Sequence, residues 1–377
     1  MTKFVGLFIG VTVFIGCGTA RGTGAPDLAK TFDGSSRDLK STAVVPTLDT
    51  GVQEGQNAVW CASFLAAWKS LDREIAHGEI LLDGSPQTAA ALNAADDPAP
   101  NIPEGALYVA SGWNDKGVIE KICRELKTGF PEKSPPAFPG IAPDSFLAYS
   151  YLEANVPFGL PYFQSRKPLE FTDTKGRKSQ VSSFGIRPED EYAYYQLRSQ
   201  ARVLFRKGSS FGSGFEFAVD LCANSSPSQI VVARINPEMS LAKALERIER
   251  GADELDKVRE KDPGSAEYYE EIGPNDVLLV PDLCYQISHR FAELEGRRFL
   301  NASLTDQRID VAQQDILFRL DRSGAELKSE SKIEYLPIPT YFVLDRPFLI
   351  YMKKRGAAKP YFVMWIDNAE LLTPWKR

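Results

Sequence analysis

Histidine is scarce in this sequence of 377 residues, and the common motifs that hold metals or phosphates are missing. The two histidines, His77 and His289, lie far apart, and neither has a second ligand at the spacing of a metal site. No CxxC pair, HExxH helix or glycine-rich phosphate loop occurs. We therefore predict no metal, no cofactor and no catalytic centre, so the protein is not expected to be an enzyme. Both histidines are expected to be surface or core residues.

A concentrated basic surface is missing too. The chain has 44 Lys and Arg against 50 Asp and Glu, and the basic residues are scattered along it. Nucleic-acid-binding domains instead gather Lys and Arg on one face, so we predict no nucleic-acid partner. The apolar content of 43% is sufficient for a core, which favours a globular chain over a disordered one.

An apolar run at the N-terminus, residues 4–16, follows the single lysine of MTK. Its 13 residues are too few to cross a bilayer comfortably and are typical of a secretory signal peptide. The run ends in FIGC, which resembles the bacterial lipobox, where small residues precede a cysteine that is diacylated and becomes the new N-terminus. We predict that residues 1–16 are removed and that a lipid on Cys17 anchors the exported protein to a membrane of the cell envelope. The alternatives are ordinary cleavage after Ala20, which gives an extracellular protein, and a retained anchor.

The next segment, residues 17–54, is rich in Gly, Thr, Ser and Asp and has no hydrophobic periodicity. This composition predicts a flexible tether, followed by a single domain over residues 55–377. Four cysteines remain beyond Cys17, and they allow three pairings if disulfides form in an oxidising compartment. Buried free thiols are the alternative. These cysteines are Cys61, Cys123, Cys222 and Cys284.

Helical patterns come early in the chain and strand patterns dominate from residue 145 on, which indicates an α+β fold. The run 57–72 begins as a short strand and continues as an amphipathic helix, and further helices are expected at 115–130 and 240–255. The segment 145–156 is apolar on both faces, as a central strand is. The other predicted strands are 200–207, 215–223, 228–235, 276–287, 315–321 and 361–366.

One short motif, GSSFG at 208–212, has the G-x-S-x-G spacing of the α/β-hydrolase elbow, with Ser210 as the nucleophile. That elbow needs a strand before it and a helix after it. Here a second predicted strand follows, so we interpret the motif as the turn of a hairpin. A hydrolase that uses Ser210 is the remotest of the functions considered.

The stretch FVLDRPFLIYM at 342–352 consists of two apolar blocks separated by Asp345, Arg346 and Pro347. Neither block alternates, so both strands are expected to be covered on both faces. A proline cannot donate a ladder hydrogen bond and is tolerated at a strand entrance. KKRGAAKP is then typical of a turn, and residues 361–366 return as the second strand of a buried hairpin.

This stretch resembles the C-terminal signature of the serpins, in which an apolar strand, an Asn/Asp-basic-Pro-Phe element and a second strand follow one another. The segments 57–68, 145–163, 240–255 and 315–326 also resemble serpin segments and occur in the serpin order. The resemblance implies a serpin-like fold of large, mostly antiparallel sheets with helices packed on them and a shortened helical region. We expect a monomer. The signature residues are Phe342, Asp345, Arg346, Pro347 and Phe348.

The resemblance also implies an exposed reactive loop at about residues 324–339. In inhibitory serpins a protease cleaves this loop, stays attached as an acyl-enzyme, and is trapped when the loop inserts into a large sheet as a strand. Residues 325–332 alternate between small or apolar side chains and charged ones, as an inserting or edge strand does. The loop residues assigned to the site are Gly324, Ala325, Leu327, Ser329, Ser331, Tyr335, Leu336 and Pro337.

Several residues depart from the serpin pattern. Arg322 stands where a glutamate is usual before the hinge, and Leu327 is bulky. The scissile bond is placed at Leu336-Pro337, where the proline ring hinders most serine proteases. The region where the sheet opens is expected to lack the hydrogen-bonded cluster of the serpins. Its matched positions are Cys61, Phe64, Ala148 and Gln314.

Two functions remain open from the sequence. The first is a serine-type protease inhibitor or protease-binding protein that acts through the loop, with a protease as its protein partner. The second is a non-inhibitory, serpin-fold binding module of the cell envelope, in which the loop is a recognition strand or a remnant.

Overall fold

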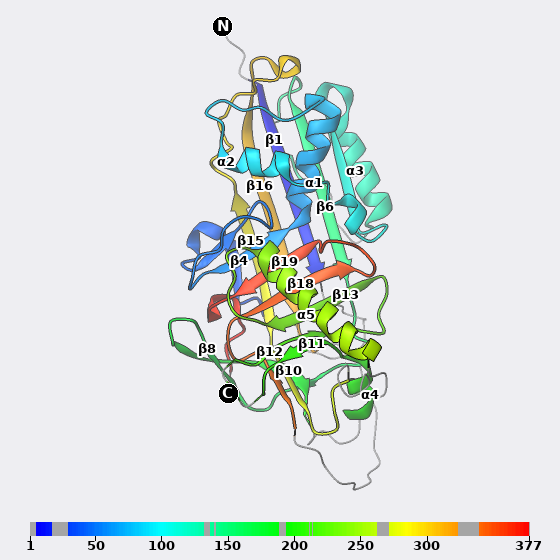
Figure 1. Ribbon diagram of the computed structural model, residues 1–377. Helices are drawn as coiled ribbons and strands as arrows, with labels where there is room; N and C mark the ends of the chain where they lie inside the picture. Colours follow the sequence, from blue (N-terminus) through cyan, green and yellow to red (C-terminus); the bar gives the residue numbers. More distant parts are fainter. Residues whose placement is uncertain are drawn as a thin grey trace.

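The computed structural model describes one N-terminal segment and most of the chain from residue 29 on. The described ranges are 5–16, 29–131, 136–138, 141–187, 194–210, 212, 214–261, 271–322 and 339–376. Figure 1 shows an elongated molecule in which long strands run along the upper part and shorter strands cross below them. Within the described ranges, no helix is long and apolar enough to cross a membrane.

The long strands form a six-stranded sheet, called here the long sheet. Most of its neighbours in space are far apart in sequence, so the sheet collects segments from both ends of the chain. Its order is β2 (Phe32–Ser35), β15 (Leu283–Arg290), β16 (Gln307–Leu320), β1 (Val5–Gly16), β6 (Phe146–Asn155) and β5 (Leu107–Trp113). The predicted central position of the strand at 145–156 is confirmed, since β6 has a neighbour on each side.

The strand β1 lies in the middle of the long sheet, parallel to β16 on one side and to β6 on the other (Figure 1). All 12 residues of β1 pair with β16, up to Gly16 opposite Arg319, with one shift in register between Leu7 and Phe8. The segment predicted as a signal peptide is therefore a strand of the full-length chain. Its removal in the cell stays a prediction.

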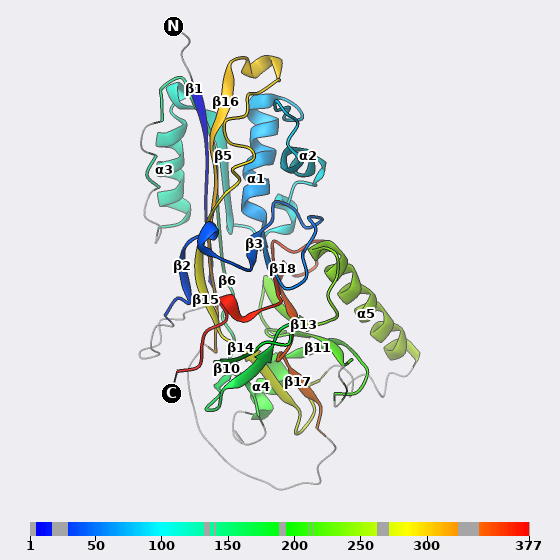
Figure 2. The same ribbon diagram turned by 90° about the vertical axis from the view of Figure 1, so that its left-hand side faces the viewer.

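Helices cover both faces of the long sheet, as Figure 2 shows with the sheet seen from its edge. On one face α3 (Val118–Gly129) packs on β5 and β6. On the other, α1 (Ala62–Leu71) packs on β5, β6 and β1 and is almost completely buried. The predicted helices at 115–130 and within 57–72 are confirmed, because their apolar stripes face these cores.

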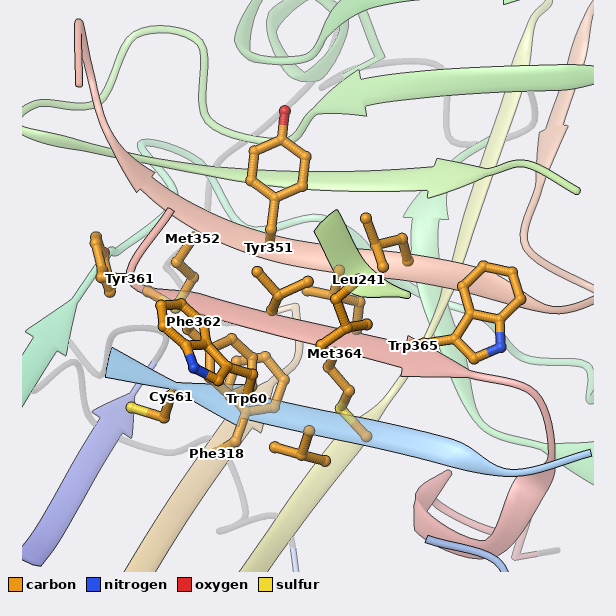
Figure 3. Close-up of a cluster of buried hydrophobic side chains, with 14 of the residues drawn as sticks. Trp60, Cys61, Leu241, Phe318, Tyr351, Met352, Tyr361, Phe362, Met364 and Trp365 are labelled. Carbon is orange, nitrogen blue, oxygen red and sulfur yellow. The ribbon is translucent and has the colours of Figure 1, made fainter. Parts of the chain in front are cut away.

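A seven-stranded sheet, called here the core sheet, crosses below the long sheet. Its order is β11 (Arg202–Lys207), β12 (Glu216–Asp220), β13 (Ser228–Arg234), β18 (Phe348–Lys354), β19 (Phe362–Ile366), β4 (Asn57–Cys61) and β3 (Thr42–Val44). The predicted C-terminal hairpin is confirmed as β18 and β19, which pair antiparallel at the centre. Every residue of β19 is buried, and Phe362 stacks on Phe318 of β16 at 4.6 Å, which ties the two sheets together (Figure 3).

The third sheet has four strands and lies at the lower end of the molecule in Figure 1. Its order is β17 (Tyr341–Val343), β14 (Val277–Pro281), β10 (Ser183–Ile186) and β7 (Phe163–Gln164). The prediction of one strand over 276–287 is wrong, because the segment forms two strands. The chain leaves β14 of the four-stranded sheet at Asp282 and continues as β15 of the long sheet. A separate ribbon pairs β8 (Leu169–Thr172) with β9 (Lys178–Val181).

The two halves of the signature stretch belong to different sheets, β17 to the four-stranded sheet and β18 to the core sheet. The polar residues between them make the crossing. Asp345 forms an ion pair with Arg234 at 3.0 Å, and Pro347 stands directly before β18, the strand entrance predicted for it. The signature therefore has a structural role in connecting two sheets.

The remaining helices are short, apart from α5, which lies beside the edge of the core sheet in Figure 2. They are α2 (Gln87–Ala94), α4 (Tyr194–Gln200) and α5 (Leu241–Lys261), with a π-helical turn at Asp72–Ala76. Single 3-10 turns occur at Ser36–Asp38, Ala99–Asn101, Asn114–Lys116, Ala302–Leu304 and Ala369–Leu371.

The prediction of a flexible tether up to residue 54 is wrong for the described part of that segment. β2 adds to the edge of the long sheet and β3 to the edge of the core sheet. The carboxylate of Glu370 accepts hydrogen bonds from the backbone N–H groups of Lys40 and Ser41 and from the hydroxyl of Thr42. These short strands lack apolar periodicity, so their partners rather than their own sequence hold them.

Candidate functional site at the base of the loop

The assigned loop residues, from Gly324 to Pro337, lie outside the described residues. The structure does describe the chain on either side of them. It leaves the long sheet after Leu320, the last residue of β16, and returns through Pro339 and Thr340 to β17. The candidate site therefore consists of these two bases and of the long-sheet strands beside which the loop begins.

The first base is held by a cluster of ionisable residues where β15, β16 and the four-stranded sheet meet. Arg319 and Asp321 form an ion pair in which the aspartate is buried. The guanidinium of Arg322 donates to the backbone carbonyl of Tyr162 at 2.9 Å. The residue that departs from the serpin pattern thus fixes the start of the loop to the segment between β6 and β7.

Asp282 is the most buried member of this cluster, with none of its surface exposed. Its Oδ2 accepts from the amide of Gln164 at 2.6 Å, whereas its Oδ1 has no hydrogen-bond partner. Burial raises the pKa of the carboxyl to about 7; the Gln164 hydrogen bond opposes this shift and the charge of Asp321 adds to it. The group is therefore close to half-ionised at neutral pH.

The second base is held by a carboxylate that is bound on both oxygens. Asp276 accepts from the backbone N–H of Thr340 at 2.6 Å and from that of Gly273 at 2.7 Å. The N–H of Val277 in turn donates to the carbonyl of Thr340, and β17 then runs parallel to β14. The chain before the loop is thus bound to Tyr162, directly before β7, and the chain after it to Asp276, directly before β14. Both β7 and β14 belong to the four-stranded sheet.

A hydrogen-bonded cluster also spans the middle of the long sheet, so the prediction that this region lacks one is wrong. The amide of Gln314 on β16 donates to the hydroxyl of Ser63 at 3.0 Å and to the carbonyl of Cys61 at 3.1 Å. The hydroxyl of Ser150 on β6 donates to the carbonyl of Ser63 at 2.6 Å. We call Ser63, Ser150 and Gln314 the polar clamp.

The polar clamp joins the two strands between which β1 lies. Val11 is in register with Gln314 on one side and with Ser150 on the other. The N-terminal end of α1, which carries Ser63, therefore links β16 and β6 at the level of the middle of β1. Of the four matched positions, Gln314 belongs to the clamp and Cys61 supplies an acceptor, while Phe64 and Ala148 are buried apolar residues.

Both histidines have the contacts of residues that stabilise the fold. The ring of His289 hydrogen-bonds to the hydroxyl of Ser36 at 2.8 Å and meets the ring of Phe291 edge-on. Burial lowers the pKa of His289 to about 4, so it is neutral at physiological pH. His77 ends the π-helical turn in a left-handed conformation, with φ of 54°. Among the described residues, no group of three or more His, Cys, Asp or Glu could hold a metal ion.

Neither the GSSFG segment nor the cysteines have the surroundings of a catalytic nucleophile. The GSSFG segment connects β11 to β12, which pair antiparallel, so the hairpin interpretation is confirmed and the hydrolase elbow is wrong. The four cysteines are free thiols. Burial raises the pKa of Cys61 to about 11 and that of Cys222 to about 12, which leaves both as unreactive thiols.

Searches with protein-family models and among curated proteins gave no match. The chain is similar to solved structures of serpins. These include the thermophilic serpin tengpin in its native state (12% identity, TM-score 0.47, covering 84% of this chain and 90% of that one) and the mouse protein Z-dependent protease inhibitor (12%, 0.46, 83% and 91%). Native protease nexin-1, solved with heparin, is similar at 12% identity and a TM-score of 0.42, over 83% and 92% of the two chains. The likeness concerns how the chain is arranged in space.

The arrangement is α+β, as predicted, and it is similar to that of the serpins. Among the described residues, ten strand pairings are antiparallel and five are parallel, and helices pack on the long sheet. Two parts of the candidate site were missed from the sequence, Asp282 and the clamp serines. Each had a signal, because each is a polar residue inside a mainly apolar run: Asp282 in DVLLVPDLCYQI, Ser63 in NAVWCASFLAAW and Ser150 in SFLAYSYL.

Proposed function

We propose that this serpin-like protein is a protease inhibitor or protease-binding protein that presents residues 324–339 as its reactive loop. After cleavage, the freed end of the loop enters the long sheet between β16 and β6. The observation that carries the proposal is the position of β1. The two strands β16 and β6 accommodate a whole strand between them, and the loop departs from the C-terminal end of β16 at Leu320.

The direction of the inserted strand follows from the connection. A segment that turns back at the end of β16 and pairs with it runs antiparallel to it. β1 runs parallel to β16 instead. The loop would therefore take the position of β1 in the opposite direction, and the two strands exclude each other.

Export is part of this proposal. Cleavage before Cys17 would remove β1 whole, because the strand ends at Gly16. The protein that begins at Cys17 would then offer the position between β16 and β6 to its loop, while the lipid on Cys17 anchors it to a membrane. Incorporation of a labelled fatty acid by cells, lost in Cys17→Ser, is the expected result. Labelling that persists in the serine variant would contradict the lipid site.

The main experiment incubates the chain from Cys17 on with a panel of serine and cysteine proteases. A complex that survives denaturing electrophoresis is expected with at least one of them, and cutting of the loop should raise the midpoint of thermal unfolding. The matched variants are Ser329→Pro and Ser329→Ala. The proline removes a ladder donor from the predicted inserting segment and should abolish the complex, whereas the alanine should preserve it.

A second function, a non-inhibitory binding module, is favoured by one observation. Arg322 ties the start of the loop to Tyr162, so insertion would have to break this contact. Cleavage of the loop without a stable complex, together with an unchanged unfolding midpoint, would support this module and overturn the inhibitor.

A further inference from the structure

Asp282 occupies the junction of two sheets and is not fully hydrogen-bonded there. Its own N–H donates to the carbonyl of Ser182, and its carbonyl accepts from the N–H of Thr373, both at 2.9 Å. The backbone is thus satisfied, but Oδ1 of the side chain is buried without a partner. An ionised carboxylate at this buried position loses its hydration free energy without gaining hydrogen bonds in exchange. A protonated carboxyl is hydrated less strongly in water, so its burial costs much less free energy.

The same amide reaches a second group that is only partly satisfied. Gln164 Nε2 donates to Asp282 Oδ2 and, at 3.0 Å, to the backbone carbonyl of Ser183. The hydroxyl of Ser183 is also buried without a hydrogen-bond partner. Two of the five buried side-chain atoms without a partner in the described part of the chain therefore belong to groups connected through Gln164. This junction is held less completely than the rest of the core.

The charges around Asp282 do not neutralise it. Asp321 is the like charge, and Arg319 and Arg322 are the opposite ones. Arg319 is engaged by Asp321 and Arg322 by the carbonyl of Tyr162, and no ion pair within 4 Å to Asp282 occurs among the described residues. The groups that face it from β7, β10 and the C-terminal segment, Gln164, Ser183 and Thr373, carry no charge.

We propose that Asp282 is a proton-operated switch at the base of the loop. When it is protonated, the junction between β14, β15 and the end of β16 stays closed. When it is ionised, opening of the junction is favoured, because the carboxylate then gains water and access to the guanidinium groups of Arg319 and Arg322.

The direction of the pH effect follows from the pKa of the closed state. Burial raises the pKa of Asp282 from 3.8 to about 7, so the closed junction binds the proton more tightly than an open one with an ordinary pKa. The closed state is therefore favoured at low pH, and opening becomes easier as the pH rises from about 4 to about 7, with no further change above that.

The switch can be tested without a protease, since opening of the junction can be measured directly. Its effect on loop insertion rests on the proposed function. The first step of insertion is departure of the loop base from Tyr162 and from this junction, so insertion would be faster at neutral than at acidic pH.

Amide hydrogen exchange in the full-length chain tests the switch. The exchange rates of the amides of β15 and of the C-terminal residues of β16, up to Leu320, are compared between the wild type and Asp282→Asn. Both proteins are measured at the same pH, which cancels the intrinsic pH dependence of exchange. At about pH 8 the wild type should exchange roughly tenfold or more faster than the variant, and at about pH 3.5, below the ordinary pKa of the open state, the two should agree within about twofold. Asp310→Asn, an exposed site far along β16, is the matched control and should match the wild type at both pH values.

A second variant guards against a local disturbance by the asparagine. Asp321→Asn removes the like charge, so it should move the midpoint of the pH profile to lower pH and reduce the total change in exchange rate across it. A wild-type-to-Asp282→Asn ratio that is the same at both pH values, or an unmoved midpoint in Asp321→Asn, would overturn the switch. Neither result would bear on whether a protease is trapped.

Discussion

The core sheet and the long sheet are held in different ways. At the centre of the core sheet, β18 and β19 are neighbours in sequence and β19 is buried along its whole length. At the centre of the long sheet, β1 meets β6 and β16, which lie about 140 and 300 residues further along the chain. A hairpin between adjacent segments is costly to separate. In contrast, β1 can leave without moving a chain connection between other strands, and its departure frees the facing sides of β16 and β6.

Their polar residues differ in the same sense. The core sheet has an apolar centre, with Phe362 packed on Phe318 (Figure 3). Its buried polar groups lie at strand ends and are paired, as Asp220 is with Arg355 and Asn57 with Asn368. The long sheet instead has the polar clamp beside the middle of β1 and a buried, partly satisfied carboxylate at its end. Apolar packing favours one arrangement strongly, whereas hydrogen bonds between strands can be exchanged for others. The comparison indicates a rigid sheet beside one that can rearrange.

The largest effect is expected from Phe362→Ala in the core sheet. The ring is fully buried and stacks on Phe318, so truncation should cost about 3 to 5 kcal/mol of unfolding free energy. Denaturant unfolding measures this loss. Leu300→Ala, at a side chain that is 62% exposed, is the control and should stay within about 0.5 kcal/mol. A loss below about 1 kcal/mol for Phe362→Ala would contradict the rigid-sheet description.

A smaller effect is expected from Val11→Pro in the full-length chain. The proline takes a ladder donor out of the middle of β1, which should cost about 2 to 3 kcal/mol and bring the unfolding midpoint towards that of the chain from Cys17 on. Val11→Ala keeps the backbone donor and serves as the matched control. If both variants unfold like the wild type, β1 does not contribute to the long sheet in solution.

The smallest effect is expected from Gln314→Leu in the polar clamp. Its amide donates twice, and the loss of both hydrogen bonds should cost about 1 to 2 kcal/mol. Gln313→Leu, the neighbouring and half-buried glutamine, is the control. Equal losses in the two variants would show that the clamp does not hold β16 to α1. Combined with Val11→Pro, the Gln314 variant should show non-additive losses if clamp and strand act together.

The sequence determined the elements whose signals are local. The helix α1, the helix α3 and the hairpin of β18 and β19 could be predicted because periodicity, burial on both faces and turn residues lie within each segment. The entrance position of Pro347 followed from the chemistry of proline alone. The α+β class followed from the order of these segments along the chain.

Tertiary structure decided the rest. The apolar run that forms β1 is typical of a signal peptide and equally suits a strand, and only its partners β6 and β16 distinguish the two. The short strands β2 and β3 form because sheet edges accept them, and nothing in their own pattern required it. Asp282 and Gln314 became parts of a site because β14 ends where β16 ends and α1 begins beside β6. Long-range pairing and the burial of single polar groups depend on which segments meet, and that information is not contained in any one of them.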